Sequence, residues 1–302
     1  MLGSTADSLY WIFRYLERTE NIIYLIETGF QLHLISSKNL NDWNSILKTN
    51  GIENVLNNKN NSNIKIVNFM LRDKKNPNNV LSLITKVRQN ARKSRVSLTR
   101  EVWESINSFW LFLNEHLNSN ILEKELDFLL KKIKQKIALI FGFINKTMLR
   151  NEILNFCFLG TFIERFDNTV RILNTKYFNN STNIDFKIKT EFQLEIILRS
   201  ISAYRSFMWK NQNIINEKLI SKFLIFDNSM PRSLVFCINE IIDNLKHVSS
   251  KNSRSLRNAR ALKRELFLIK ILSDIRFHND LIKLINLNIQ LGKIIEEEFN
   301  FH

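Results

Sequence analysis

Apolar side chains recur at intervals of three and four residues along almost the whole chain, as they do on one face of an α-helix. The first segment begins at "STAD", which resembles a capping box in which Ser4 caps and Asp7 replaces the usual Glu, and it continues to about His33. Further helices are predicted at 41–49, 64–72, 77–117, 122–146, 148–178, 187–211, 214–226, 231–248, 253–276 and 280–299. Polar loops are predicted at 57–63 and 179–183.

Composition supports a fold built from helices alone. With Gly 6 and Pro 2 in 302 residues, the chain is too poor in turn residues for a sheet with many hairpins. Phe 23 and a hydrophobic share of 44% indicate an ordered interior. The start lacks the basic-then-apolar pattern of a signal peptide, and the longest apolar run, 137–144, is too short to span a bilayer. We therefore expect a cytoplasmic all-α protein with no membrane segment.

One motif occurs twice. "YLERTEN" (15–21) and "FIERFDN" (162–168) align at a shift of 147, and "WNSILK" (43–48) meets "LEIILR" (194–199) further on. "FMLRDKKNPNNVL" (69–81) then meets "FLIFDNSMPRSLV" (223–235), so that Pro77 and Pro231 fall at equivalent places, where a first-turn proline would start a helix. The three blocks predict a single domain, 1–302. We expect it to be a helical bundle of two tandem-duplicated halves, 1–147 and 148–302, with pseudo-two-fold symmetry.

The motif forms a polar stripe on an otherwise apolar helix. At about 100° per residue, positions i, i+3, i+4 and i+7 share one face. A helix that is apolar around most of its girth is buried, so we expect the stripe to be buried as well. In the first copy the stripe and its acidic neighbour are Arg14, Glu17, Arg18, Glu20 and Asn21; in the second they are Thr161, Glu164, Arg165, Asp167 and Asn168.

Buried charges need partners, and the two copies could supply them. In the structural interpretation, Glu17 pairs with Arg165 and Glu164 with Arg18 across the pseudo-dyad, which fixes how the halves dock. In the functional interpretation, the acidic residues line a central cavity with the arginines and bind a charged ligand or perform acid–base work. A dimetal centre is a further alternative, because helical bundles build such sites from paired Glu residues with Glu-x-x-His. The chain lacks that motif, and its histidines are scattered, so no metal and no cofactor are predicted (His33, His116, His247, His278 and His302).

The net charge is +15, which suggests anionic partners, although the abundance of Asn, Lys and Ile is also typical of compositional drift. Two helical faces are candidate anion or partner sites and also fit ordinary solvated faces. The first holds Arg88, Arg92 and Arg95; the second holds Arg254, Arg257 and Arg264, with Arg260 beside them. Nucleic acid is disfavoured because the sequence has no zinc finger, helix-turn-helix signature or RNP-type aromatic motif. Asp73 and Asp227, each four residues before a proline, are predicted turn residues.

The chain resembles the alpha-E family, bacterial all-helical proteins named for their Glu-Arg motif. The resemblance spans nearly the whole chain. It is carried by "SLYWIFRYLERTEN", by "NPNNVL", "RQNARKSR" and "REVWESIN", by "TMLR" and "GTFIERFDNTVRILNTKY", and by "SISAYRSF" and "FLIFDNSMPRSLVFCI". The family motif falls on the residues of the two stripes. The second copy departs from it: Thr161 stands where Arg is usual, Phe162 replaces Tyr, and Phe166 replaces a small residue.

The resemblance implies a setting for the protein. Members of this family are typically encoded beside a circularly permuted ATP-grasp protein and often beside transglutaminase-like or proteasome-like peptidases, which implies making or processing a peptide or amide bond. The leading prediction is an accessory or scaffold protein that binds the ATP-grasp amide ligase or its peptide substrate. The alternatives are an enzyme that acts on a peptide or amide through the Glu/Arg cluster, and a nucleic-acid-binding helical protein.

Overall fold

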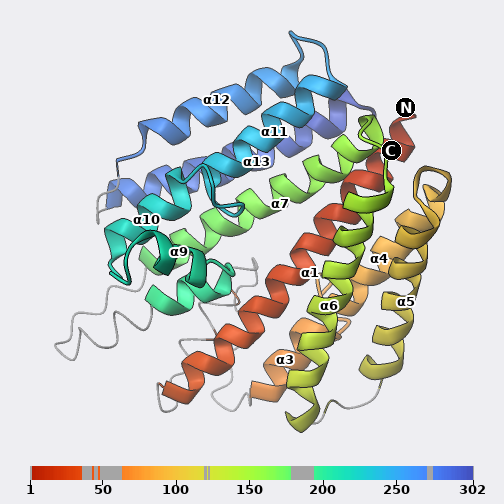
Figure 1. The fold of residues 1–302 in the computed structure, drawn as a ribbon, viewed down its shortest axis with the longest axis horizontal. Helices are drawn as coiled ribbons and strands as arrows, with labels where there is room; N and C mark the ends of the chain where they lie inside the picture. The colour runs from red at the N-terminus through yellow and green to blue at the C-terminus, as the bar shows by residue number, and fades with distance from the viewer. Residues whose placement is uncertain are drawn as a thin grey trace. The chain divides into compact units, whose positions relative to one another are not determined.

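The computed structural model describes residues 2–35, 43, 47, 63–118, 121, 123–177, 194–270 and 275–301. All regular structure in these residues is helical, and none of them forms a strand (Figure 1). The all-α prediction is therefore confirmed. The helices are α1 (Gly3–Ile35), α3 (Asn63–Leu71), α4 (Val80–Lys93), α5 (Arg100–Leu117), α6 (Glu123–Thr147), α7 (Glu152–Tyr177), α9 (Tyr204–Lys210), α10 (Glu217–Phe226), α11 (Leu234–Val248), α12 (Arg254–Leu268) and α13 (Ile275–Glu298).

The chain divides into two compact units. Unit 1 contains Met1–Ile26, Leu56–Thr161 and Phe299–His302, and unit 2 contains Glu27–Val55 and Phe162–Glu298. Helices α1 and α7 contribute residues to both units. This division differs from the predicted repeats 1–147 and 148–302, and the common origin of those repeats stays a prediction.

Each unit contains a series of helices that are consecutive in sequence and pack side by side. In unit 1, α4 contacts α5 and α5 contacts α6, around fully buried Val87, Phe109 and Ile133 (Figure 1). In unit 2, α11 contacts α12 and α12 contacts α13, around fully buried Ile241 and nearly buried Leu262. Burying one such large apolar side chain stabilises the fold by about 2 kcal/mol. The apolar stripe of each helix therefore determines which face packs inward.

The predicted helix 77–117 is interrupted in the structure. A 3₁₀ turn, Arg95–Ser97, separates α4 from α5. The Ser94 hydroxyl donates to the Asn90 carbonyl oxygen at 2.9 Å, and Thr99 is the N-cap of α5. Ser and Thr compete for backbone hydrogen bonds in this way and favour helix ends. The interruption lets α5 turn back and pack against α4.

The predicted helix 187–211 is also interrupted. Residues 194–200 are helical, Ser202 has φ 55°, and α9 begins at Tyr204. The Ala203 amide closes the preceding turn by donating to the Leu198 carbonyl at 2.7 Å. The remainder of that prediction, 187–193, lies outside the described residues. So do the predicted loop 179–183 and nearly all of 57–63, and only Trp43 and Leu47 of the predicted helix 41–49 are described.

Three predicted helix starts were wrong. Ser4 is not a cap, because α1 already begins at Gly3. A Cβ atom at Gly3 would lie 2.3 Å from the Asn300 carbonyl oxygen, so close backbone packing sets this end of the helix. Pro77 and Pro231 do not occupy the first turn either, since α4 begins at Val80 and α11 at Leu234. Both prolines precede the N-cap by two residues, inside a turn.

The turns that contain these prolines have the same hydrogen bonds. Asp73 accepts from the Lys75 amide and Asp227 from the Ser229 amide, both at 2.9 Å, which confirms both as turn residues. At the end of the turn, Asn79 caps α4 by accepting from the Ser82 amide at 2.8 Å. The equivalent cap of α11 accepts from the Phe236 amide at 3.1 Å and is supplied by Ser233. The backbone of the two turns is thus held in the same way at a shift of 154.

The predicted helix 253–276 is shorter than expected. α12 ends at Leu268, where Ile269 is an extended C-cap. Residues 271–274 lie outside the described part, and α13 begins at Ile275, five residues before its predicted start at 280. No helix within the described part of the chain is long and apolar enough to cross a membrane.

Candidate functional site

The first copy of the motif lies on α1 among buried apolar side chains. Phe13 and Leu16 are completely buried, and within this surface Glu17 is 0% and Asn21 3% exposed. Arg18 is half-buried. A buried carboxylate is costly unless it is paired or hydrogen-bonded. Glu17 and Arg18 each have at least one hydrogen-bonding, ionic, aromatic or electrostatic interaction.

The second copy, on α7, repeats the same burial pattern. Glu164 is 4% and Asn168 8% exposed, whereas Arg165 and Asp167 are half-buried. Each copy therefore places its Glu and Asn inside the protein and its Arg at the edge. The predicted pairs Glu17–Arg165 and Glu164–Arg18 would join residues of different units, and they stay a prediction.

Arg165 and Thr169 connect α7 to the turn before α11. Arg165 Nη1 donates to the Pro231 carbonyl oxygen at 3.4 Å, and its guanidinium carbon lies 5.3 Å from the centre of the Phe162 ring. One turn further along, Thr169 Oγ1 donates to the Arg232 carbonyl oxygen at 2.9 Å. The second copy of the motif thus holds the backbone of the turn that caps α11.

Asp167 pairs within its own helix. Arg171 Nε donates to Asp167 Oδ2 at 2.6 Å, an i,i+4 pair in which the aspartate side chain is only 14% exposed. Such pairs stabilise the helix that contains them. One acidic member of the predicted cluster is therefore already neutralised locally.

A carboxyl group that sequence analysis missed lies near Arg165. Burial raises the pKa of Glu240 on α11, the negative charge of Asp243 raises it further, and the positive charge of Arg165 partly opposes the rise. A half-buried carboxyl group with a raised pKa can hold a proton closer to neutral pH than an exposed one. No motif points to Glu240, because its environment comes from packing between helices.

The first position of the stripe differs between the two copies, because Arg14 contacts aromatic side chains and the equivalent Thr161 does not. The guanidinium carbon of Arg14 lies 4.7 Å from the centre of the Trp11 ring, and Arg14 Nη1 donates to the Tyr10 hydroxyl at 3.4 Å. On α7 the equivalent Thr161 donates to the Cys157 carbonyl of its own helix at 3.1 Å. The substitution of Thr for Arg therefore leaves no polar group there that needs a partner outside the helix.

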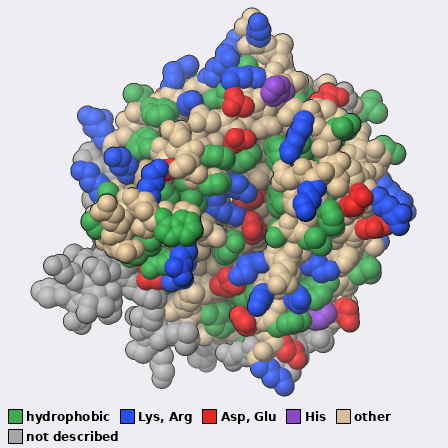
Figure 2. Space-filling model, viewed as in Figure 1, with side chains coloured by type: hydrophobic (Ala, Val, Ile, Leu, Met, Phe, Trp, Pro, Cys, Tyr) green, Lys and Arg blue, Asp and Glu red, His purple; other side chains and the backbone are tan. Residues whose placement is uncertain are grey.

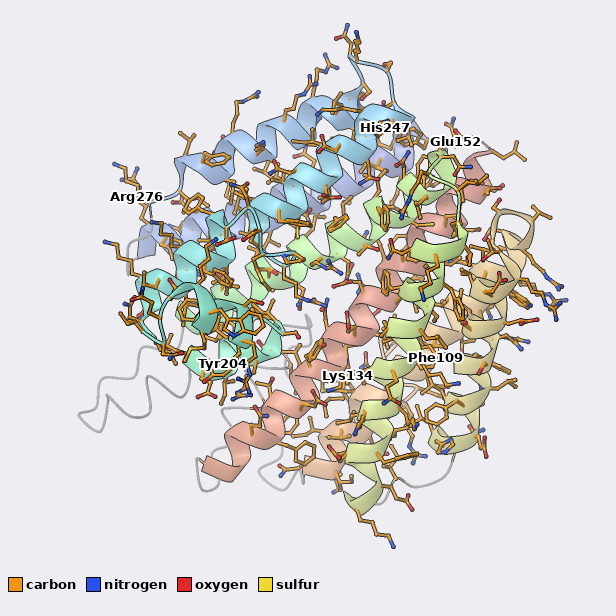
Figure 3. The ribbon with its side chains drawn as sticks, viewed as in Figure 1. Phe109, Lys134, Glu152, Tyr204, His247 and Arg276 are labelled. Atoms are coloured by element: carbon orange, nitrogen blue, oxygen red, sulfur yellow. The ribbon has the colours of Figure 1, made fainter. Side chains whose placement is uncertain are left out.

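Lys134 of α6 lies beside the far end of the α1 motif. Figure 3 labels Lys134 on α6. Its ammonium nitrogen is 5.5 Å from the centre of the Tyr24 ring. Closer to the start of the motif, the Lys86 ammonium nitrogen of α4 lies 5.5 Å from the Tyr15 ring. Cations stacked on aromatic faces stabilise the contact by about 0.5–1 kcal/mol at exposed sites. Both lysines therefore hold neighbouring helices against α1.

A glycine lets α7 approach α1. A Cβ atom at Gly160 would lie 2.2 Å from the Tyr10 carbonyl oxygen and 3.3 Å from the Arg14 amide nitrogen. Real side chains do not approach a backbone so closely, so this contact requires glycine. Sequence analysis missed this position, although a glycine inside an apolar helix is a recognised signal of close backbone packing.

Two buried amide groups complete the surroundings of the second copy. Asn288 Nδ2 of α13 donates to the Ile163 carbonyl oxygen at 3.2 Å. Asn288 Oδ1 and Asn168 Nδ2 are buried and have no hydrogen-bond partner within the part of the chain that the structure describes. The second copy therefore has buried polar atoms one helical turn from Glu164, at Asn168, and at the Ile163 carbonyl, which accepts from Asn288.

The two predicted basic faces differ in the structure. On α4, Arg88 Nε donates to Asn107 Oδ1 at 2.8 Å, and its guanidinium carbon lies 4.1 Å from the Trp110 ring centre. Arg92 is exposed, and the guanidinium carbon of Arg95 lies 5.2 Å from the Trp103 ring. Arg88 and Arg95 therefore pack against α5.

The α12 face is more open. Arg254 Nη2 lies 3.3 Å from a carboxylate oxygen of Glu297. Arg257, Arg260 and Arg264 are exposed and form no ion pair among the described residues. In Figure 2, Lys and Arg side chains lie along the upper-left edge where α12 runs. A group of three or more potential His, Cys, Asp or Glu metal ligands is not found within the described ranges.

The two buried Glu-Arg dipeptides agree with a known family. The family described as a predicted alpha-helical domain with a conserved ER motif, Alpha-E, matches residues 1–299. The chain belongs to the Alpha-E family. Among curated proteins and among solved structures, no significant match is found. In this Alpha-E protein, Glu17-Arg18 and Glu164-Arg165 are the two Glu-Arg dipeptides of the sequence, and each has a buried Glu beside a half-buried Arg.

Proposed function

We propose that this Alpha-E protein is an accessory or scaffold protein that binds an ATP-grasp amide ligase or the peptide substrate of that ligase. One observation supports this role over catalysis: the half-buried charged side chains of the α7 motif, Arg165 and Asp167, are engaged with the scaffold. Arg165 and Thr169 donate to the backbone carbonyls of Pro231 and Arg232, and Asp167 pairs with Arg171. A catalytic group must instead be able to contact its substrate.

Co-purification and turnover test the accessory role. The tagged chain is expressed with the adjacently encoded ATP-grasp protein and isolated through the tag. ATP-dependent ligation is then measured with each protein alone and with both. We expect the two proteins to co-purify, the ligase to require ATP, and the added chain to raise product formation while forming no product alone. Turnover by the chain alone would contradict the proposal.

Substitution of the buried glutamates separates the two main functions. Glu17→Gln and Glu164→Gln remove a buried charge whose partners remain, which costs about 3 kcal/mol when a buried pair is broken. The accessory role predicts that the unfolding free energy and ligase binding fall together. Lost turnover in a variant of unchanged unfolding free energy would support the enzyme instead.

A peptide- or amide-processing enzyme is the second candidate, because Glu240 has a raised pKa beside Arg165. Glu240→Gln tests it. If the chain is an enzyme, this variant should form less product, and the acidic limb of the pH–rate profile should disappear. If the chain has the accessory role, the variant should still stimulate the ligase. Nucleic-acid binding is the third candidate, and it requires an affinity that falls steeply with salt.

A further inference from the structure

The outer side of α12 carries a continuous stripe of exposed basic and apolar residues. At about 100° per residue, its five members lie within an arc of about 100°. They are Arg257, Arg260, Arg264, Phe267 and Leu268, and all are exposed, with Phe267 56% and Leu268 72% accessible. We call these residues the α12 stripe. It has a cationic part followed by an apolar part.

The guanidinium groups of the cationic part are available to bind an anion. Arg257, Arg260 and Arg264 form no ion pair with any described residue, in contrast to Arg88, which is held by Asn107 and Trp110. Like charges at these helical spacings repel one another. An anionic partner would remove this repulsion, and arginine is suited to binding carboxylates through two hydrogen bonds.

The same helix already binds carboxylates at its beginning. Glu297 of α13 lies 3.3 Å from Arg254, and Glu298 accepts a hydrogen bond from the Ser255 amide at 2.7 Å. Acidic side chains projecting from a neighbouring helix therefore fit the surface of α12. The α12 stripe lies further along the same helix, where no described carboxylate pairs with its arginines.

The apolar part of the stripe favours a protein partner over a nucleic acid. One side of the Phe267 ring contacts Phe226, at a centroid distance of 6.0 Å, whereas Leu268 is the more exposed of the pair. A phosphate backbone offers no apolar group for Leu268. A protein segment can present carboxylates and apolar side chains in one row, and aromatic and apolar anchors contribute much of the binding free energy at interfaces.

We propose that the α12 stripe binds an acidic segment of a partner protein, whose carboxylates pair with Arg257, Arg260 and Arg264 and whose apolar residues pack on Phe267 and Leu268. The proposal deepens the accessory role proposed above, and it rests on that role for the existence of a protein partner. Electrostatic complementarity would orient the segment, and the apolar contact would fix its register.

Fluorescence anisotropy with a defined peptide tests the stripe on the full chain. The probe is a labelled helix-forming peptide with three Glu at the spacing of the three arginines, followed by two Leu at the spacing of Phe267 and Leu268. A second probe has the reversed order, and a third replaces each Glu by Gln. We expect one Glu probe to bind at least about tenfold more tightly than the Gln probe, with an affinity that falls as salt is added.

Two triple variants with the same change in net charge locate the binding. Arg257→Glu, Arg260→Glu and Arg264→Glu together should lower the affinity at least about tenfold. The control, Lys74→Glu, Arg92→Glu and Lys93→Glu, alters exposed residues in α4 and in the turn before it, and should change the affinity less than about threefold. Phe267→Ser with Leu268→Ser should lower it about fivefold. Circular dichroism melting confirms that each variant is folded.

Three results would overturn the inference: equal losses in the two triple variants, no binding of either Glu probe up to about 1 mM, or displacement of the probe by mixed-sequence DNA that binds through the same arginines. Equal losses in the two triple variants would mean that the probe binds through general charge attraction. Displacement by DNA would mean that the stripe is a nucleic-acid-binding surface. Peptide binding without ligase co-purification would contradict the accessory role alone. Ligase co-purification without peptide binding would contradict the α12 stripe alone.

Discussion

Two segments of this Alpha-E protein share a scaffold and differ in their outer surfaces. In unit 1 a capping turn leads through α4 into α5, and in unit 2 an equivalent turn leads through α11 into α12. α5 follows the N-cap Thr99 and α12 follows the N-cap Ser253, so that residues four and eleven positions after each cap can be compared. These are Trp103 and Trp110 in α5, and Arg257 and Arg264 in α12.

The difference separates what folding requires from what it leaves open. The two turns end at buried N-caps and must satisfy their backbone hydrogen bonds, which they do with the same pattern of donors and acceptors. The four compared side chains on α5 and α12 are not needed to satisfy buried backbone hydrogen bonds. In unit 1 Arg88 and Arg95 stack on the two tryptophans, whereas Arg257 and Arg264 of α12 are exposed and form no ion pair among the described residues. The same framework thus closes one surface and leaves the other available for a partner.

The largest expected effect comes from glycines in two different environments. Gly160→Ala places a methyl group against the Tyr10 carbonyl, so we expect a loss of unfolding free energy of about 3 kcal/mol or more. Gly142→Ala is the control, because no atom lies within 4 Å of its Cβ position. It should stabilise α6 by about 0.5–1 kcal/mol. Urea unfolding measures both, and equal effects would contradict the close approach of α7 to α1.

The two capping turns should respond to substitution in the same direction. We expect Asn79→Ala to cost about 2 kcal/mol and Ser233→Ala about 1 kcal/mol. Both caps also donate to the aspartate carbonyl oxygen of their turn, Asn79 to Asp73 and Ser233 to Asp227. The larger cost at Asn79 reflects its further donation to the carbonyl oxygen of Asn76. The exchanges Asn79→Ser and Ser233→Asn should each cost less than the corresponding alanine substitution. If thermal unfolding shows either exchange to cost more, the two turns are not equivalent.

The two arginine faces should differ in their contribution to stability. Arg88→Ala removes a stacking contact and a hydrogen bond, and should cost about 1 kcal/mol. Arg264→Ala on the α12 stripe should change stability by less than about 0.5 kcal/mol. Chemical denaturation of both variants measures the difference. A cost at Arg264 as large as that at Arg88 would show that the α12 arginines are structural.

The smallest effect concerns an ion pair found in the unit 2 turn. Burial would raise the pKa of Asp227, but hydrogen bonds from Lys210 and Ser229 and the lysine charge outweigh it, so the pKa is lowered. The stabilisation is therefore complete above about pH 4 and is lost as the pH falls through the lowered value. We expect Asp227→Asn or Lys210→Met to reduce stability by less than about 1 kcal/mol at neutral pH.

Measurements of unfolding free energy at about pH 7 and about pH 3 test this prediction. Both variants should lose less stability on acidification than the wild-type chain does. An unchanged difference between the two pH values would mean that the Lys210–Asp227 pair does not contribute to folding.

Sequence patterns predicted helices well where an apolar stripe and a cap coincide. The predicted segment 231–248 compares with α11, Leu234–Val248, whose first turn is capped by Ser233. The break between α4 and α5 was missed because it contains neither Gly nor Pro, and its Ser and Thr residues also occur inside helices. The break at Ser202 depends on a positive φ angle in a residue type that rarely adopts one.

The candidate site could be predicted only as far as one helix determines it. The apolar girth of α1 and α7 correctly indicated that Glu17 and Glu164 are buried. The donation from Thr169 to the Arg232 carbonyl spans 63 residues of sequence, and the raised pKa of Glu240 depends on Arg165 of another helix. Such relationships arise from packing between helices, which the periodicity of a single segment does not encode.

The short segment that follows α13 returns to unit 1. The Phe299 ring centre lies 4.9 Å from that of Phe156, the Phe301 ring centre lies 5.4 Å from that of Tyr10, and Gly3 touches the backbone of residues 299 and 300. Removing this segment would therefore remove the aromatic contacts of Phe299 and Phe301 from unit 1. The opening turn of α1 therefore depends on residues 299 and 300, which lie nearly 300 positions further along the chain.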